Sequence, residues 1–314
     1  MKLPDYTDVV KAHELIRPLV HRTPVLTSSS INLITGAQLY FKCENLQKVG
    51  AFKFRGACNA VFSLSDEQVA RGVCTHSSGN HAAALALAAR LCGVPAYIVM
   101  PSNAPSIKKK AVEGYGAQIT FCEPTLASRE STLAEIAAKT GATEIHPYNN
   151  FEVIAGQGTA AKELLEEVGP LDILLCPIGG GGLLSGTSIT GRELNSKGLV
   201  IAAEPEGADD AYRSFHAKKL IPSVNPKTIA DGLLTSVGEI NFRIIQRKTD
   251  EIVTVSERGI VQAMRMIWER MKIIVEPSSA VALAAILENK VEVKDKKIGV
   301  ILSGGNVDLD NLPF

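Results

Sequence analysis

Short apolar runs alternate with longer segments of helical spacing along most of the 314-residue chain. The runs are rich in Val, Ile, Leu and Phe at successive positions, which is typical of strands buried on both faces of a parallel sheet. Parallel neighbours need a helical crossover between them, so the alternation predicts an α/β fold. The predicted strands are 39–42, 73–76, 96–100, 118–121, 173–177, 200–203, 252–255 and 298–302.

The longer segments predict helices, one of which begins with a capping box formed by Ser65 and Gln68. The predicted helices are 8–17, 66–71, 80–92, 106–113, 128–139, 158–168, 183–195, 257–272 and 278–287. The units between about 73 and 146 look self-contained. We therefore expect a large domain of residues 1–68 and 150–314, a small domain of residues 69–149, and a ligand-binding cleft between them.

The charge balance argues against nucleic acid and anionic lipid as partners. Lys plus Arg number 33, and so do Asp plus Glu, so no whole-molecule field attracts phosphate groups. The most apolar stretch, 82–100, contains Arg90 and a Gly-Val-Pro break, so no membrane span is predicted. The first residues lack the features of a targeting signal, and we expect a cytoplasmic protein. Six cysteines without a C-x-x-C pair predict buried thiols.

Four consecutive glycines, Gly179, Gly180, Gly181 and Gly182, connect a predicted strand to a predicted helix. Because they lack Cβ atoms, their N–H groups can converge on one anion, and the helix N-terminus adds unpaired donors. An ordinary tight turn needs only one or two glycines, so the pattern favours a phosphate site. The spacing matches neither the dinucleotide nor the nucleoside-triphosphate loop.

Lys53 lies between Phe52 and Phe54. An apolar setting disfavours the ammonium form, so the neutral amine becomes available as a nucleophile or base. The alternative is a solvated lysine on a half-buried element.

Three polar turns follow predicted strands. Residues 75–81, Thr-His-Ser-Ser-Gly-Asn-His, open a predicted helix and suit either a ligand or an ordinary helix cap. Residues 303–306 read Ser-Gly-Gly-Asn. Residues 204–210 contain four carboxylates, which suits either a hard cation such as Mg²⁺ or a solvated acidic loop.

Phe-Lys-Phe-Arg-Gly around Lys53, Ser-Ser-Gly-Asn-His at 77–81, the glycine tetrad and Ser-Gly-Gly-Asn at 303–306 occur in order over essentially the whole chain. Together they resemble the serine racemase and serine/threonine dehydratase family of fold-type II pyridoxal-phosphate enzymes. The resemblance implies two open, twisted, largely parallel sheets flanked by helices. It places the active site in the cleft between the large and small domains.

The same resemblance implies the residues that bind cofactor and substrate. Lys53 would hold pyridoxal phosphate as a Schiff base, Phe52 would line the ring, and Ser303 would contact the pyridine nitrogen. The other implied cofactor ligands are Asn80 at the ring hydroxyl and Gly179, Gly180, Gly181, Gly182 and Leu183 at the phosphate. The implied substrate-binding residues are Ser77, Ser78, Gly79, Asn80 and His81.

By resemblance, the enzyme would interconvert L- and D-serine, with Lys53 and Ser78 moving the α-proton on opposite faces. Loss of the β-hydroxyl would give pyruvate and ammonia. A dehydratase (ammonia-lyase) acting on serine, threonine or 3-hydroxyaspartate, or a β-replacement enzyme, is the alternative within the family. A non-catalytic phosphate-binding regulator would need only the glycine tetrad, so this class also stays open.

The resemblance to the racemase branch further implies a divalent cation, Mg²⁺, Ca²⁺ or Mn²⁺, and a homodimer. The cation ligands would be Glu204, the carbonyl of Ala208, and Asp210. Positions that bind ATP in the animal enzymes correspond to Ser28, Ser29, Lys48, Tyr115 and Asn306. Val49 and Ala83 replace polar side chains of those enzymes, which leaves ATP as an effector open.

Overall fold

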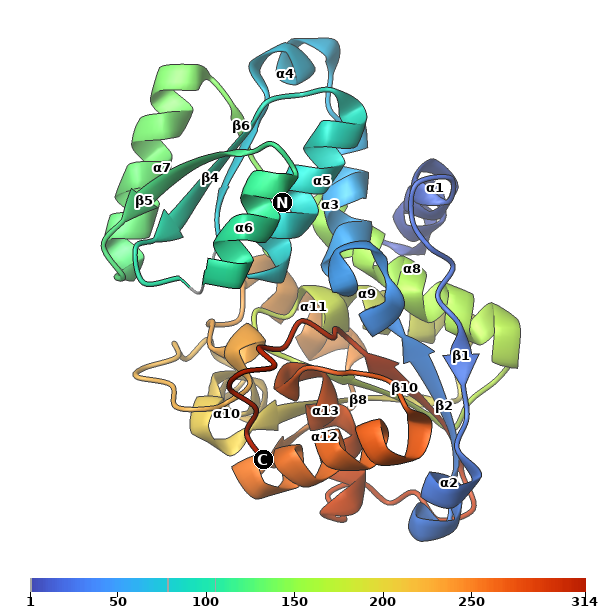
Figure 1. Ribbon diagram of the computed structural model, residues 1–314. Coiled ribbons are helices and arrows are strands. Elements are labelled where there is room, and N and C mark those ends of the chain that lie inside the picture. Colours follow the sequence, from blue (N-terminus) through green and yellow to red (C-terminus); the bar gives the residue numbers. More distant parts are fainter. Residues whose placement is uncertain (1, 78, 105) are drawn as a thin grey trace.

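The computed structural model of the protein describes residues 2–77, 79–104 and 106–314, and these form two sheets flanked by helices (Figure 1). The larger sheet has the order β1 (Val25–Leu26), β2 (Gln38–Cys43), β10 (Lys297–Leu302), β7 (Ile173–Pro177), β8 (Leu199–Pro205) and β9 (Glu251–Val255). The smaller sheet has the order β5 (Gln118–Cys122), β4 (Ala96–Pro101), β3 (Val73–His76) and β6 (Thr143–Glu144). The described strand pairs are parallel except for β1 with β2. The predicted fold class is therefore confirmed.

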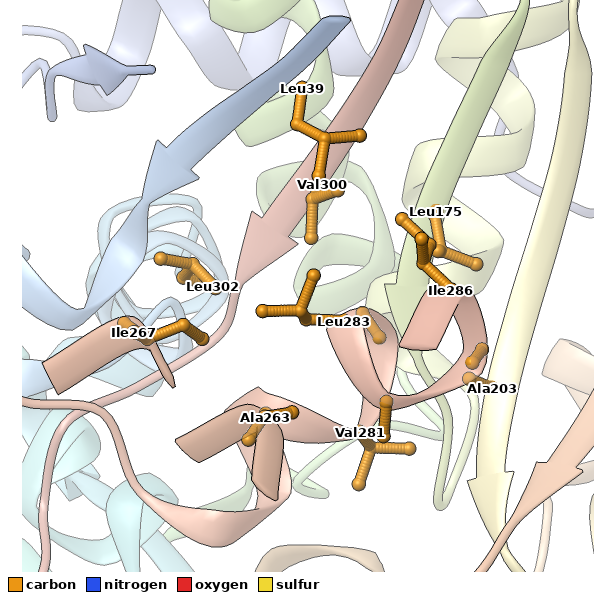
Figure 2. Close-up of a cluster of buried hydrophobic side chains, with 14 of the residues drawn as sticks. Leu39, Leu175, Ala203, Ala263, Ile267, Val281, Leu283, Ile286, Val300 and Leu302 are labelled. Atoms are coloured by element: carbon orange, nitrogen blue, oxygen red, sulfur yellow. The ribbon is translucent and has the colours of Figure 1, made fainter. Parts of the chain in front are cut away.

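Helices cover both faces of the larger sheet because its central strands are apolar on both sides. On β7, Ile173 and Leu175 face α12 (Glu257–Met271) and α13 (Pro277–Leu287), while Leu174 and Cys176 face α8 (Phe151–Val168) and α9 (Gly182–Leu194). In Figure 2, Leu283 of α13 lies among side chains from the strands and from α12. Burying a Leu side chain of this kind contributes about 1.5–3 kcal/mol to stability.

The remaining helices connect the strands or cover the smaller sheet. They are α1 (Tyr6–Ile16), α2 (Ser29–Thr35), α3 (Lys53–Phe62), α4 (Asp66–Arg71), α5 (Asn80–Cys92), α6 (Ser106–Gly114), α7 (Leu126–Thr140), α10 (Asp210–Ala217) and α11 (Glu239–Lys248). Short 3₁₀ turns are η1 (Glu44–Leu46), η2 (Lys48–Gly50), η3 (Glu206–Ala208) and η4 (Asp231–Leu233).

The smaller sheet packs against α5 and α3 on one face and against α7 on the other. Val73, Ile98 and Met100 belong to the first core cluster, together with Phe54 and Val61 of α3. Helix α3 thus shares a core with the smaller sheet, although we expect residues 1–68 in the large domain. The domain boundaries at 68/69 and 149/150 stay a prediction.

The predicted strands each lie within an observed strand, and helices α4 and α5 have the predicted bounds. The two-residue strands β1 and β6 were not predicted, because such short runs carry no period. The predicted start of helix α8, residue 158, is wrong: the helix begins at Phe151, where the Asn150 side chain accepts the Val153 N–H at 3.0 Å. Gly156 and Gly158 lower the helix propensity of this segment, yet both lie inside the helix.

The cysteines are unpaired, as predicted, and all but half-buried Cys92 are buried. Burial raises the pKa of the Cys43, Cys58 and Cys176 thiols to about 12 and that of Cys74 to about 11. Among the described helices, none is both long and apolar enough to cross a bilayer.

Candidate active site

Three of the turns that were predicted to carry chemistry follow strands of the larger sheet and leave it at the same end, whereas the turn at 75–81 follows β3 of the smaller sheet. In the register of the sheet, Leu302 of β10 pairs with Cys43 of β2, and Pro177 of β7 pairs with Ala203 of β8. Neighbouring parallel strands end at the same edge, which is where open α/β sheets bind ligands. Ser303, the glycine tetrad and the acidic turn therefore begin side by side.

Lys53 is the first residue of α3, and its side chain is partly buried. Its Nζ donates a hydrogen bond to the Pro147 carbonyl at 2.8 Å and lies 5.2 Å from the Phe52 ring centroid and 5.9 Å from that of Tyr148. Burial lowers the pKa of the Lys53 amine to about 8, although Glu276 opposes the shift. Part of the amine is therefore neutral near neutral pH.

The glycine tetrad forms the turn between β7 and α9, and Gly181 has a φ of 91°, which favours glycine. A Cβ on Gly180 would lie 2.4 Å from the Tyr148 ring, and one on Gly179 would lie 2.9 Å from the Leu233 Cα. Side chains at these positions would thus collide with Tyr148 and Leu233, which pack closely on the turn. Leu183 follows in the first turn of α9, where N–H groups lack partners within the helix.

The turn before α5 brings Ser77, Gly79 and Asn80 to the cleft. The Gly79 N–H donates to Ser77 Oγ at 3.3 Å, and Asn80 begins the helix. Ser78, the predicted second catalytic residue, lies outside the described residues. His81 is buried and its Nε2–H donates to the Ile145 carbonyl at 2.9 Å; burial lowers the pKa of His81 to about 3, so the ring is neutral.

The parts of the chain built on the larger and the smaller sheet are called the larger and the smaller lobe below. Asn80 of the smaller lobe contacts Glu276 of the larger lobe, a residue that the sequence analysis missed. Asn80 Nδ2 donates to both Glu276 carboxylate oxygens at 2.9 and 3.2 Å, and Asn306 Nδ2 donates to Asn80 Oδ1 at 2.9 Å. Glu276 precedes α13 and is 4% exposed. Burial raises the pKa of its carboxyl to about 7, with a further contribution from Asp231. The Glu-Pro pair before a helix was the available signal.

Ser303 lies at the end of β10, beside the predicted Schiff-base lysine. Its carbonyl accepts the Phe52 N–H at 3.0 Å, and the neighbouring Gly304 forms a bridge with Ala51. The strand end therefore positions Ser303 and Lys53 on adjoining segments. Ser303 is 3% exposed.

A second group that the sequence did not predict consists of His146 and Tyr148. Nδ1 of His146 accepts the Tyr148 and Asn149 N–H groups at 3.3 and 3.0 Å, which places the proton on Nε2. Burial, with His76 and Lys53 nearby, lowers the pKa of His146 to about 4. The ring thus fixes the turn that supplies the carbonyl partner of Lys53.

The three predicted cation ligands come together at the end of β8. Glu204 accepts the Ala211 and Tyr212 N–H groups at 3.1 and 2.8 Å, and Asp210 Oδ2 accepts the Val237 N–H at 3.0 Å. Asp210 Oδ1 is buried without a partner among the described residues. Burial raises the pKa of Glu204 to about 9 and that of Asp210 to about 6.

Ala208, in η3, adds only a carbonyl, and no described cluster has three His, Cys, Asp or Glu side chains placed for a metal. Two carboxylates and a carbonyl still form an oxygen donor set that fits a hard cation.

A cavity of about 710 Å³ opens between the lobes beside Asn80. Tyr115 and Asn306 line it, together with the apolar Val49 and Ala83. The other residues implied for ATP are not among those that line the cavity: Ser28 caps α2, Ser29 begins α2, and Lys48 begins η2.

The chain matches the family described as "Pyridoxal-phosphate dependent enzyme" over residues 16–304. It belongs to this family. It is 54% identical over 314 residues to the β-hydroxyaspartate dehydratase of Paracoccus denitrificans, covering 100% of both chains. It is 54% identical over 312 residues to the serine racemase of Dictyostelium discoideum, covering 97% of this chain and 95% of that one. The solved maize serine racemase is similar, with 46% identity, a TM-score of 0.96, and coverage of 98% and 95%.

The described residues fit the family's cofactor. Lys53 offers an amine with a lowered pKa to an aldehyde, and the tetrad offers a cradle in which a Cβ would clash. Tyr148 lies between Lys53 and the glycine tetrad, because its ring packs against Gly180 and its centroid is 5.9 Å from the Lys53 amine. Asn80 lines the cavity, and the Ser303 carbonyl accepts the N–H of Phe52, the residue before Lys53. Their roles at the cofactor ring stay a prediction.

Proposed function

We propose that this pyridoxal-phosphate dependent enzyme interconverts L- and D-serine and also eliminates water from serine, giving pyruvate and ammonia. The observation that carries the proposal is Lys53, whose amine, with a pKa lowered to about 8 by burial, adjoins the turn that packs on the glycine tetrad. A racemase needs such an amine as a base of moderate strength. Similarity to serine racemases over nearly the whole chain supports the same activity.

Pyridoxal phosphate, when bound, withdraws electrons from the α-carbon and acidifies its proton. Lys53 would then remove and return that proton on one face of the substrate. The N–H groups of the turn before α5 would hold the substrate carboxylate at a helix N-terminus. Return of the proton on the opposite face needs a second acid, which we assign to Ser78.

A dehydratase acting on 3-hydroxyaspartate is the second candidate. The observation that favours it is the similarity to the Paracoccus β-hydroxyaspartate dehydratase, which matches this chain from end to end. Both activities begin with loss of the α-proton to Lys53. They differ in whether the proton returns or the β-hydroxyl leaves, a choice that each 1.4 kcal/mol of barrier shifts about tenfold.

The test is to incubate the purified holoenzyme with L-serine, D-serine or 3-hydroxyaspartate in deuterium oxide. Chiral chromatography and mass spectrometry would follow each enantiomer, its α-deuterium and the keto acid. We expect α-deuterated D-serine together with pyruvate from L-serine. Keto acid without D-serine, and fastest from 3-hydroxyaspartate, would replace the racemase with the dehydratase.

Two variants locate the bases. Lys53→Ala is expected to lose both racemisation and elimination. Ser78→Ala is expected to lose racemisation while L-serine elimination stays measurable, and unchanged racemisation would show that another group is the second acid. Asn289→Ala, at an exposed left-handed position remote from the cleft, is the matched control.

We also propose that Glu204, Asp210 and the Ala208 carbonyl hold Mg²⁺ or a similar hard cation. The unpartnered Asp210 oxygen and the raised pKa values of both carboxyls support this proposal. A bound cation would neutralise both groups and link the end of β8 to the start of α10.

The family resemblance supports two further proposals, a homodimer and an ATP effector. Leu33 and Ile34 of α2 are 85% and 55% exposed, which is typical of a face covered by another subunit. Light scattering would measure the mass. Calorimetric titration with Mg·ATP would test the cavity that Tyr115 and Asn306 line, and no binding heat would remove ATP from the proposal.

A further inference from the structure

Helix α8 lies beside α3, which begins with Lys53 (Figure 1), and the two helices approach closely at two glycines. A Cβ on Gly156 of α8 would lie 2.7 Å from the Gly56 Cα and 2.8 Å from the Arg55 carbonyl oxygen. The Gly56 N–H also donates to Gln157 Oε1 at 3.2 Å. Backbone atoms, rather than adaptable side chains, therefore set the separation of α3 and α8.

The same helix approaches α9 closely as well. A Cβ on Gly186 of α9 would lie 2.4 Å from the backbone nitrogen of Gly158 in α8. Thr190 Oγ1 of α9 donates to the Gly158 carbonyl at 3.1 Å. Helix α9 begins at Gly182, the last glycine of the tetrad, so its position relative to α8 fixes the position of the tetrad.

Buried charges hold α3 in place along α8. The Arg55 guanidinium donates to Glu44 at 2.7 and 2.8 Å and to Glu163 of α8 at 2.8 and 2.7 Å. Lys42 donates to the same Glu163 at 2.7 Å, and the four side chains are at most 3% exposed. The planar guanidinium accepts only one orientation toward two carboxylates, so this buried quartet of Lys42, Glu44, Arg55 and Glu163 opposes sliding of α3.

We infer that α8 is a spacer helix, which sets the distance between the Lys53 amine and the glycine tetrad through Arg55, Gly156 and Gly186. These three are positioning residues, because none of them contacts the cofactor's proposed anchors through its own side chain. The inference rests on Lys53 and the tetrad as the two anchors of pyridoxal phosphate. A cofactor held at both ends needs this distance to match its own length.

Three ligands distinguish a change in the distance between the two anchors from damage to either anchor alone. Pyridoxal phosphate engages both anchors: its aldehyde carbon forms an imine with Lys53 Nζ and one water is lost, while its phosphate binds the tetrad. Pyridoxine 5′-phosphate has an alcohol in place of the aldehyde and engages only the tetrad. Pyridoxal lacks the phosphate and reacts only with Lys53. Affinities would be measured by fluorescence titration, and imine formation by borohydride trapping with peptide mass spectrometry.

Gly156→Ala would push α3 away from α8, and Arg55→Lys would remove the guanidinium while keeping one charge. For both variants we expect the affinity for pyridoxal phosphate to fall by about tenfold or more. The affinities for pyridoxine 5′-phosphate and pyridoxal should each change by less than about threefold, because each anchor alone remains intact. Gly186→Ala should give the same pattern by displacing α9.

The matched control is Gly259→Ala in α12, on the opposite face of the larger sheet, where a Cβ would also meet a close neighbour, Glu288. It should leave the ratio of the three affinities unchanged. If the variants of Arg55, Gly156 and Gly186 weaken the affinities for all three ligands equally, or weaken none of them, the proposed role of α8 as a spacer helix would be overturned. Absence of a trapped imine at Lys53 in the unmodified chain would instead overturn the cofactor site itself.

Discussion

Two groups of buried carboxylates in the larger lobe differ in how their charge is balanced. In the buried quartet, Glu44 and Glu163 face Arg55 and Lys42, and although burial opposes it, these cations lower the pKa of Glu163 to about 2. Near the end of β8, burial raises the pKa of Glu204 to about 9.

Glu204 and Asp210 accept only backbone N–H groups, and neither forms an ion pair within the described residues. The quartet is neutralised by Lys42 and Arg55 of the chain itself, so it needs no added cation. Glu204 and Asp210 are also buried carboxylates, but no cationic side chain pairs with them in the part of the chain that the structure describes. The difference supports the proposal that Glu204 and Asp210 hold a cation, because the chain supplies no cationic side chain to pair with them among the residues described.

The largest expected effect comes from removing one member of the quartet. Arg55→Met leaves two carboxylates facing one lysine, so the free energy of unfolding should fall by about 3–5 kcal/mol. Glu204→Gln breaks no ion pair and removes one of the two acceptors of the Ala211 and Tyr212 N–H groups, so the cation-free protein should lose only about 1–3 kcal/mol. Urea denaturation at pH 7 with a chelator measures both. Similar losses in the two variants would remove the distinction.

Addition of a divalent cation should stabilise only the second pair. At a Mg²⁺ concentration 100 times its Kd, the free energy of unfolding should rise by about 2.7 kcal/mol. Asp210→Asn should abolish this gain, because it removes one of the two carboxylates. Thermal unfolding with Mg²⁺, and with NaCl at equal ionic strength as control, checks it. An equal gain from NaCl would point to general screening.

The free energy of unfolding should change with pH in opposite directions for Glu204 and for Glu163. The pKa of Glu204 is raised from 4.5 to about 9, so the folded state binds more protons than the unfolded state between these values. Stability without a cation should therefore fall as pH rises through this window, by at most about 1.4 kcal/mol per pH unit for one proton.

Glu163 behaves oppositely, because its pKa is lowered from 4.5 to about 2. Its contribution is present above pH 4.5 and is lost as pH falls towards 2. Urea unfolding from pH 5 to 9, with chelator and with Mg²⁺, tests the fall in stability that is predicted for Glu204. Bound Mg²⁺ should make this fall smaller. A flat profile with chelator would contradict the raised pKa of Glu204.

The smallest expected effect comes from an exposed pair, Glu239 and Arg243 on α11. Arg243→Ala should lower the free energy of unfolding by no more than about 0.5 kcal/mol, because water already screens both charges. The same urea measurement gives the value. A loss approaching that of Arg55→Met would mean that burial does not decide the difference.

Much of the fold could be predicted from the sequence because strand burial and helix caps are local signals. The capping box at Ser65 and Gln68 forms as predicted, and the segment 173–177 is a strand buried on both faces. The start of α8 could not be predicted, because Gly156 and Gly158 serve contacts with other helices. Their low helix propensity is overridden by packing that the sequence does not record.

The residues of the candidate site also divide into those that a local sequence pattern indicates and those that only the fold brings together. Lys53 and the glycine tetrad carry local patterns that indicate an amine in an apolar setting and an anion cradle. Glu276 was missed because its partner Asn80 lies 196 residues away in the sequence. His146 was missed because its burial and its place near Lys53 depend on the fold. The buried quartet joins three separate segments, the stretch from Lys42 to Glu44, α3 and α8, so no spacing along the chain could have indicated it.

The burial of the thiols determines how the protein can be labelled. Thiolate is the reactive form, and a buried thiol whose pKa is raised to 11 or 12 yields almost none at pH 7. Cys92, half-buried at the end of α5, is the cysteine that a maleimide dye would reach first. A single fluorophore there would report from the smaller lobe without any engineered cysteine, while the thiols of both cores stay untouched.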